Sequence, residues 1–207
     1  MKKMYCIYGA GGHSKVVLEI LENSGCIIKE LYDDHLNKLM LLGYKVSNNK
    51  EILELPELNW IVGVGDNSIR RKIAQSHLLN YGQAIDIKAN ISKRIQIGAG
   101  VAIMSGVTIN SSVIIGNHVI VNTNASIDHD CIIGDYAHIS PNAVLCGGVS
   151  VGEGSHIGAG ATIIPGINIG NWVRIGAGSV IINDVPDYAT VVGNPGKTIK
   201  IIKENER

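Results

Sequence analysis

Residues 109–139 read INSSVIIGNHVIVNTNASIDHDCIIGDYAHI, and a large apolar residue occupies every sixth position of this stretch. The same spacing runs without a break from Ile91 to Ile181. A period of six fits neither an α-helix nor an alternating strand. It is typical of a parallel β-helix, in which each turn of the chain stacks on the turn before it. A β-sandwich would instead place its turn signals about every 8–12 residues.

A second apolar series lies four residues after the first, runs from Ile95 to Val185, and includes small residues such as Ala125 and Cys131. We expect the large residues to point inward from flat sides and the small residues to lie near corners. Gly often follows the large residue, where a corner needs positive φ or close backbone approach. Three hexapeptides make one coil of about eighteen residues, so residues eighteen apart should stack about 4.8 Å apart.

The N-terminal region lacks the repeat and has an α/β pattern instead. Apolar runs predict strands at 5–8, 27–32 and 60–64, and helical periodicity predicts helices at 13–23 and about 68–81. This order is typical of a small Rossmann-like βαβαβ unit. We therefore predict three parts, an α/β domain at 1–85, a β-helix at 86–185 and a C-terminal tail at 186–207.

A glycine-rich turn, Gly9-Ala10-Gly11-Gly12, joins the first predicted strand to the first predicted helix. Glycines let the backbone approach an anion and a helix N-terminus attracts it, so the turn predicts a phosphate site. Asp33 ends the next strand, where a carboxylate can bind a ribose or a base edge. Because Ser14 replaces the last Gly of GxGxxG, we favour a nucleotide-linked ligand over NAD. A purely structural turn is the alternative.

His129 lies between Asp128 and Asp130, two carboxylates that can orient its ring and raise its basicity. Gly147 is eighteen residues further on, so a position without a side chain should lie directly above this histidine. A glycine at this position would leave space beside the ring and expose a backbone N–H that can stabilise an oxyanion. This arrangement predicts that His129 is a catalytic base. His138 is half a coil away. If both histidines serve one site, His138 should come from a neighbouring subunit.

Composition excludes several function classes. The 207 residues carry no formal net charge, which argues against nucleic acid or an anionic membrane as the main partner. No stretch approaches the ~20 apolar residues of a membrane span, so we expect no membrane insertion. The four cysteines form no CxxC, and we expect reduced thiols in a cytoplasmic protein. Cys131 should point inward, away from His129, which disfavours a cysteine acyl-enzyme.

A zinc-dependent β-helix enzyme of the carbonic anhydrase kind is a further alternative. Three histidine ligands usually include a close pair, and the repeat region contains no such pair. We therefore expect no metal.

Several blocks of sequence together carry a resemblance to a known family. They are IYGAGGH at 7–13, Asp33-Asp34, VGVGDN at 62–67, Asn122-Thr123, IDHDC at 127–131, Ile133-Gly134 and VGNPGK at 192–197. With these blocks the chain resembles the hexapeptide-repeat sugar acyltransferases of the sialic acid O-acetyltransferase and bacillosamine N-acetyltransferase (NeuD/PglD) type. The likeness covers nearly the whole chain.

The resemblance implies a left-handed β-helix, a homotrimer, and acetyl-CoA bound in grooves between adjacent β-helices. It implies direct N-acetylation of a nucleotide-linked amino sugar, such as a UDP-linked 4-amino-4,6-dideoxy sugar. O-acetylation of a sugar of the sialic acid type is the alternative within the family. A non-catalytic nucleotide-binding regulator is the alternative of another class.

The resemblance also implies roles for individual residues. The expected catalytic residues are His129, Asp130 and Gly147. The expected substrate-binding residues are Gly9, Gly11, Gly12, His13, Asp33, Asp34, Gly65, Asp66, Asn67 and Asn122. The expected cofactor-binding residues are His138, Gly158, Ala159, Gly176, Ala177 and Lys197. Lys197 belongs to the C-terminal tail, which is expected to contribute to the coenzyme A groove.

Overall fold

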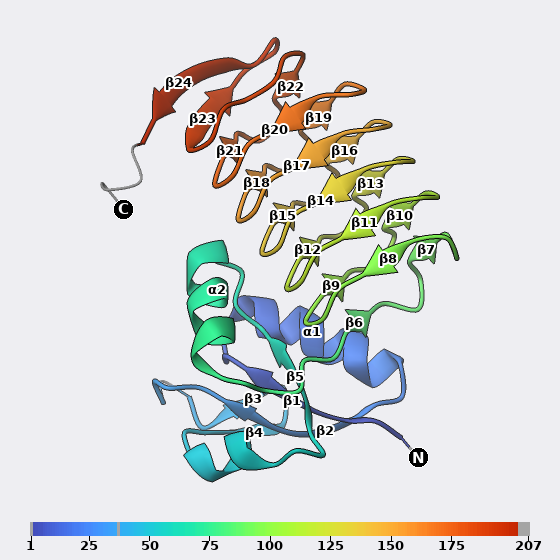
Figure 1. The fold of residues 1–207 in the computed structure, drawn as a ribbon. Coiled ribbons are helices and arrows are strands. Elements are labelled where there is room, and N and C mark those ends of the chain that lie inside the picture. Colours follow the sequence, from blue (N-terminus) through green and yellow to red (C-terminus); the bar gives the residue numbers. More distant parts are fainter. Residues whose placement is uncertain (1, 37, 203–207) are drawn as a thin grey trace.

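The computed structural model describes residues 2–36 and 38–202, which form a small α/β part and a β-helix rising from it (Figure 1). The last five residues of the predicted C-terminal tail lie outside the described residues. Neither α-helix in the described part has the length and apolar character needed to cross a membrane.

The α/β part is a five-stranded sheet with the order β3-β4-β2-β1-β5. Strands β1, β2, β4 and β5 are parallel, and β3 pairs antiparallel with β4 at the edge. The strands are β1 (Met4–Tyr8), β2 (Ile27–Tyr32), β3 (Met40–Leu41), β4 (Tyr44–Ser47) and β5 (Asn59–Val62). The helices are α1 (Gly12–Asn23), α2 (Asn67–Ser76) and the short 3₁₀ helix η1 (Lys50–Glu54).

Two features of this part differ from the sequence-based expectation. Strands β3 and β4 were not predicted, because together they are only six residues long and too short to show a period. Helix α2 ends at Ser76 rather than near Tyr81. The chain turns back there, and Trp60 exchanges backbone hydrogen bonds with Asn80 and Gly82, so this segment runs beside β5.

The β-helix consists of two-residue strands on three flat faces, which confirms the predicted fold class of an α/β domain followed by a left-handed parallel β-helix. Face I contains β6 (Ala84–Ile85), β9 (Ala102–Ile103), β12 (Ile120–Val121), β15 (His138–Ile139), β18 (His156–Ile157) and β21 (Arg174–Ile175). Face II contains β7 (Asn90–Ile91), β10 (Thr108–Ile109), β13 (Ser126–Ile127), β16 (Val144–Leu145), β19 (Thr162–Ile163) and β22 (Val180–Ile181). Face III contains β8 (Gln96–Ile97), β11 (Ile114–Ile115), β14 (Ile132–Ile133), β17 (Ser150–Val151) and β20 (Asn168–Ile169).

The tail continues face I. Strand β23 (Ala189–Val192) pairs parallel with β21, and β24 (Lys197–Ile201) folds back antiparallel on β23. The first strand of face I begins at Ala84, inside the segment that the sequence assigned to the α/β domain.

Residues eighteen apart stack, as the repeat predicts. Ile109 pairs with Ile127, and Ile127 pairs with Leu145, so identical faces of successive coils lie in register. From Ile103 upward the large residues of the sixfold series are buried in one continuous core, together with small residues such as Cys131. The ladder thus fixes which side chains point inward and which point out.

The glycines that follow the large residues serve close approach rather than positive φ. A Cβ on Gly134 would lie 2.7 Å from the backbone nitrogen of Glu153 in the next coil. The positive φ values occur two residues later instead, as at Tyr136 (φ 59). These glycines therefore let neighbouring coils touch at the corners.

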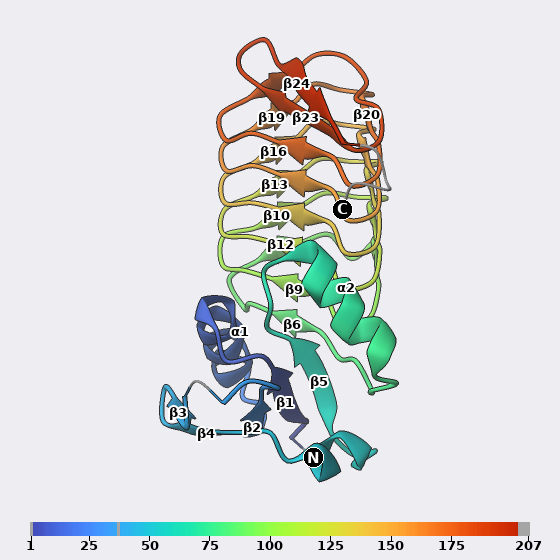
Figure 2. The ribbon, with the colours of Figure 1, turned by 90° about the vertical axis from the view of Figure 1, so that its left-hand side faces the viewer.

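The α/β part packs against the lower half of face I (Figure 2). Outward-pointing Ala102 and Ile120 belong to the same buried cluster as Val17 and Leu21 of α1. The apolar surface of the lower coils is therefore covered, whereas the upper coils of face I carry polar residues.

A buried arginine on α2 joins the two parts. Arg70 is 1% exposed. Its guanidinium donates to the backbone oxygen of His118 at 2.8 Å and to that of Tyr136 at 2.7 Å, both in the β-helix. It also donates to the oxygens of Val64 and Gly65, which hold the loop before α2. Burial lowers the pKa of Arg70 to about 10, so the group remains charged at neutral pH.

We predict that Arg70→Met lowers the free energy of unfolding by about 3 kcal/mol or more, because several buried carbonyls lose their donor at once. Lys72→Met on the exposed face of α2 is the control, and its change should stay within about 1 kcal/mol. Urea unfolding of both variants measures the difference. Equal effects would contradict a locking role for Arg70.

Candidate active site

The predicted base lies at the corner between faces II and III, in the turn from β13 to β14. The His129 side chain is 61% exposed, and its Nδ1–H donates to Asp130 Oδ2 at 2.7 Å. This hydrogen bond, followed by the charge of Asp128, raises the pKa of His129 above its ordinary value. Because Nδ1 carries the proton, Nε2 is left as the basic nitrogen facing outward.

The second carboxylate at this corner is held differently. Asp128 Oδ1 accepts the backbone N–H of His129 at 2.8 Å and the side-chain amide of Asn110 at 2.7 Å. Its other oxygen, Oδ2, lies 3.9 Å from His129 Nε2. The two carboxylates therefore flank opposite nitrogens of one ring.

The next coil leaves space above the ring. Gly148 donates its N–H to the backbone oxygen of His129 at 2.9 Å, which fixes the stacking. A Cβ on Gly147 would lie 2.7 Å from His129 Cε1 and 2.8 Å from Nε2, so only glycine fits here without moving the ring. Cys146 and Gly148 donate their N–H groups to neighbouring coils, whereas the Gly147 N–H makes no hydrogen bond within the described residues. The basic ring of His129 therefore lies next to an available backbone donor, the N–H of Gly147.

This geometry predicts a pH effect for Asp130→Asn. Asparagine tolerates the left-handed backbone of this position (φ 62), so the turn should be preserved. Loss of the carboxylate removes the interaction that stabilises the protonated ring, so the pKa of His129 should fall. The acidic limb of the kcat/KM profile should then move to lower pH while the maximal rate falls. A limb that stays in place would contradict the assignment of the base.

A second group of the expected residues gathers on face I. The Asn122 amide lies 3.1 Å from His138 Nε2, and Asn122 Oδ1 accepts the Thr123 N–H at 2.8 Å. The amide NH₂ therefore faces the ring, so Nε2 accepts and Nδ1 carries the proton. Burial lowers the pKa of His138 to about 3, with the charge of the nearby His156 as a further cause. His138 is neutral. Its buried Nδ1–H makes no hydrogen bond of good geometry within the described residues, but the Gly65 backbone lies near enough to the ring to oppose part of the pKa shift.

His138 opens onto a groove of about 1250 Å³ between the start of α2 and the upper coils. Of the expected residues, the groove is lined by Gly65, Asp66, Asn67, His138, Gly158, Ala159 and Ala177. Residues of both expected sets, substrate and cofactor, thus meet in one place. His129 does not line this groove, because it lies at the corner opposite face I.

Two residues at the start of α2 also hold structure. Asp66 caps the helix by accepting the N–H groups of Ser68 and Ile69 at 3.0 and 2.9 Å. The Asn67 amide donates to the Gly154 oxygen of the β-helix at 3.0 Å and is buried. Both residues therefore keep this wall of the groove in place.

The glycine-rich turn precedes α1 as expected. Gly9 adopts φ 108, and no side chain caps α1 at Gly11, so the N–H groups of the first turn are open to an anion. A Cβ on Gly11 or Gly12 would meet nothing within 4 Å, so the turn is unobstructed. Ser14, the departure from GxGxxG, is buried and donates to the oxygens of Gly9 and Gly63.

The aspartates and the histidine around this turn have defined places. Asp33 Oδ2 accepts the Ala10 N–H at 2.8 Å, and Asp34 Oδ2 accepts the Tyr8 hydroxyl at 2.7 Å. The His13 ring is largely enclosed, its Nε2 has no partner within the described residues, and burial lowers its pKa to about 4. These groups lie close to the glycine-rich turn, and Asp33 also stabilises the turn through its hydrogen bond with Ala10.

The structure places residues in and near the groove that the sequence reading did not assign. His156 stacks on His138 with ring centroids 4.7 Å apart and bonds to Ser140 Oγ at 2.8 Å. The spacing of eighteen residues predicts that His156 lies one coil above His138, and the structure places it in the groove rather than in a purely surface role. Arg70 gave no signal, because most of its partners are backbone oxygens, and those in the β-helix are far away in sequence. His118 is buried, and its ring stacks on that of Tyr136 with the ring centroids 5.4 Å apart.

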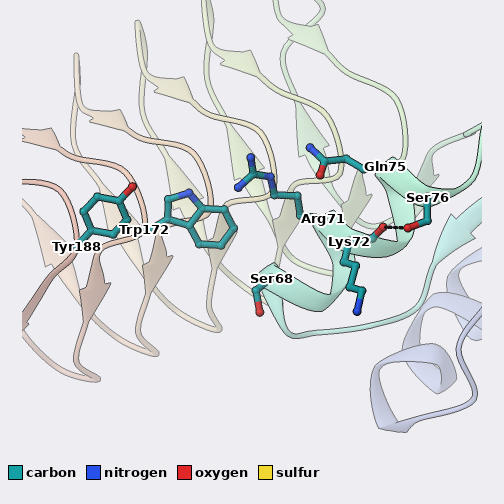
Figure 3. A pocket seen from close by; sticks show the side chains of 7 residues that line it. All are labelled: Ser68, Arg71, Lys72, Gln75, Ser76, Trp172 and Tyr188. Atoms are coloured by element: carbon teal, nitrogen blue, oxygen red, sulfur yellow. Dashed lines mark hydrogen bonds between the residues drawn. The ribbon is translucent and has the colours of Figure 1, made fainter. Parts of the chain in front are cut away.

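A smaller pocket of about 380 Å³ lies beyond Trp172, between α2 and the corner that carries Trp172 and Tyr188 (Figure 3). The Arg71 guanidinium lies 5.4 Å from the centroid of Trp172, and its Nε is 3.3 Å from Glu153 Oε1. Lys72 points away from Arg71 in Figure 3. The contacts of Arg71 with Trp172 and Glu153 join α2 to the β-helix beside this pocket.

The remaining expectations concern Lys197, the cysteines and metal. Lys197 is exposed on β24. All four cysteines are free, and the buried Cys131 thiol donates to the Cys146 oxygen at 3.2 Å, with burial raising its pKa. Across residues 2–36 and 38–202, no group of three His, Cys, Asp or Glu side chains is placed to hold a metal ion.

Comparisons with known proteins agree with this architecture. Residues 5–77 match the family described as PglD N-terminal domain. Residues 112–147, 130–165 and 148–183 each match the family described as bacterial transferase hexapeptide (six repeats). No curated protein matches the chain.

Solved structures match over almost the whole chain. PerB from Caulobacter crescentus, determined with CoA and GDP-perosamine, is 38% identical, with a TM-score of 0.88 over 95% of this chain and 97% of that chain. The acetyltransferase domain of PglB from Neisseria gonorrhoeae is 35% identical, with a TM-score of 0.89 over 96% and 100%. WeeI from Acinetobacter baumannii is 25% identical, with a TM-score of 0.86 over 95% and 100%. The chain therefore belongs to the NeuD/PglD-type family of hexapeptide-repeat sugar N-acetyltransferases.

Proposed function

We propose that this protein transfers the acetyl group of acetyl-CoA to the amino group of a nucleotide-linked 4-amino sugar. The observation that carries the proposal is the corner at His129. There, Asp130 fixes Nδ1 of the His129 ring, and Nε2 lies beside Gly147, which has no side chain. A general base next to an available backbone donor is what attack on a thioester carbonyl requires.

The reaction proceeds by direct transfer. His129 Nε2 takes a proton as the sugar amine attacks the thioester carbonyl, and Asp130 stabilises the protonated ring. The Gly147 N–H stabilises the oxyanion of the tetrahedral intermediate. The carbon–sulfur bond then breaks, its electron pair goes to sulfur, and the excess proton on the newly acylated nitrogen moves to the thiolate, so that CoA leaves as the thiol. The buried Cys131 takes no part, because its thiol is engaged inside the coil.

The groove on face I suits acetyl-CoA. Its volume of about 1250 Å³ can hold a large ligand, and the corner residues Gly158, Ala159 and Ala177 have little or no side chain. Gly176 adjoins Ala177 in sequence and lies one coil above Gly158. The exposed Lys197 offers a cation on the strand pair that extends face I. His138 lines this groove, which supports a contact with the acetyl group. PerB and PglB have been determined with CoA or acetyl-CoA bound.

The distance between the two histidine sites supports a homotrimer. His129 lies at the corner between faces II and III, whereas His138 and Asn122 belong to face I and its edge. One chain cannot bring them together, so a complete site needs His129 of one subunit beside the groove of the next. The mass of the purified protein in solution distinguishes one chain from three.

The open turn at the N-terminus of α1 supports binding of the nucleotide diphosphate. Gly9, Gly11 and Gly12 leave the backbone accessible, and His13, Asp33 and Asp34 lie beside them. We further propose that the protein acts in the cytoplasm, which its four free cysteines support.

The test is acetyl-CoA consumption with UDP-, GDP-, dTDP- and CMP-linked 4-amino sugars. We expect turnover of at least one sugar, and a loss of about 10²-fold or more in kcat for His129→Ala. Lys93→Ala, at the equivalent corner position two coils below, should leave the rate unchanged.

Other outcomes favour other functions. Acetylation of hydroxy sugars alone would favour the O-acetyltransferase. Binding without turnover, unaffected by His129→Ala, would favour a regulator.

A further inference from the structure

We propose that Asp128 binds the protonated amine of the incoming sugar and thereby makes this site select an amine over a hydroxyl. The inference rests on the proposed function and assigns a role to a residue that the acetyl transfer described above does not use. It starts from the two carboxylates at the His129 corner, which are held in different ways.

The two carboxylate oxygens of Asp128 differ in their hydrogen bonding. Oδ1 accepts from the His129 backbone N–H and from the Asn110 amide, which fix the carboxylate against the coil below. Oδ2 accepts no hydrogen bond within the described residues. The Asn110 hydrogen bond, followed by that of the His129 backbone, lowers the pKa of Asp128, so the carboxylate is ionised at neutral pH.

The open oxygen lies on the reactive side of the ring. Asp128 Oδ2 and His129 Nε2 are 3.9 Å apart, too far for a hydrogen bond to each other. That gap lets one donor nitrogen lie about 3 Å from both atoms. Asp130 cannot take this place, because its Oδ2 is bonded to Nδ1 on the opposite side of the ring.

An alkylamine is a cation at neutral pH and must lose a proton before it can attack. In the pocket between Oδ2 and Nε2, the ammonium donates one N–H to Asp128 and passes another proton to His129. The neutral amine attacks the thioester carbon to form the new C–N bond. The C–S bond then breaks, its electron pair goes to sulfur, and the second proton moves from nitrogen to the thiolate. His129 finally releases its proton to water.

A hydroxyl substrate gains less from this arrangement. It is neutral and brings one proton, which it must give to either Oδ2 or Nε2. The open oxygen of Asp128 then faces the substrate without a cation. The carboxylate therefore favours the amine in binding, whereas Asp130 acts on the ring and favours neither nucleophile.

The experiment compares the dissociation constants of GDP-perosamine and of the same GDP-sugar carrying a 4-hydroxyl, with CoA present. If the activity panel identifies a better nucleotide, the matched amino and hydroxy pair of that nucleotide replaces them. The variants are Asp128→Asn, which keeps both hydrogen bonds to Oδ1 but removes the charge, and Asp130→Asn as the matched control. Thermal unfolding checks that both remain folded.

We expect the wild type and Asp130→Asn to bind the amino sugar about tenfold or more tightly than the hydroxy sugar, and Asp128→Asn to bind the two within about threefold. The preference of the wild type should also weaken as salt is raised. An Asp128→Asn variant that is folded and keeps the full preference overturns the inference alone. Absence of turnover of any amino sugar by the wild type overturns the proposed function, and the inference with it.

Discussion

The parallel ladder that sets residues eighteen apart on top of one another is the constraint on which the rest of this molecule depends. Because each coil hydrogen-bonds to the next in a fixed register, a choice of residue at one position determines what lies above and below it. The large inward residues form one core along the whole β-helix, and the corner glycines let the coils touch. Outward positions are then free to carry chemistry without loss of the fold.

The two candidate regions use this freedom in different ways. At one corner, the absence of a side chain at Gly147 makes room for the ring of the coil below. Asp130 holds that ring by a hydrogen bond at Nδ1, whereas Asp128 lies 3.9 Å from Nε2 on the other side. On face I, the outward side chains of the lower coils are apolar and pack against α1. The upper coils instead carry His138 and His156 beside a groove. Arg70 fixes α2 between the two parts by binding backbone oxygens from both, so the groove has a rigid wall.

The sequence predicted what depends on period and spacing. The β-helix, the placement of Gly147 over His129 and the separation of His129 from His138 all follow from counting in sixes and eighteens. It did not predict β3, β4 or the early end of α2, which depend on pairing across the sheet and leave no period of their own. Nor could it find Arg70, because most of its partners are main-chain oxygens, which any residue type supplies. The different roles of Asp128 and Asp130 were also out of reach, because they depend on which ring nitrogen each one faces.

The proposed chemistry depends most on the absence of a side chain at Gly147, above the His129 ring. The variant Gly147→Ala tests this requirement most directly. The added Cβ would lie 2.7 Å from His129 Cε1, so the ring must move and the space beside Nε2 must close. Measured with acetyl-CoA and the best amino sugar, kcat/KM should fall by about 10²-fold or more while thermal unfolding stays close to that of the wild type. A folded Gly147→Ala variant with wild-type turnover would contradict the account.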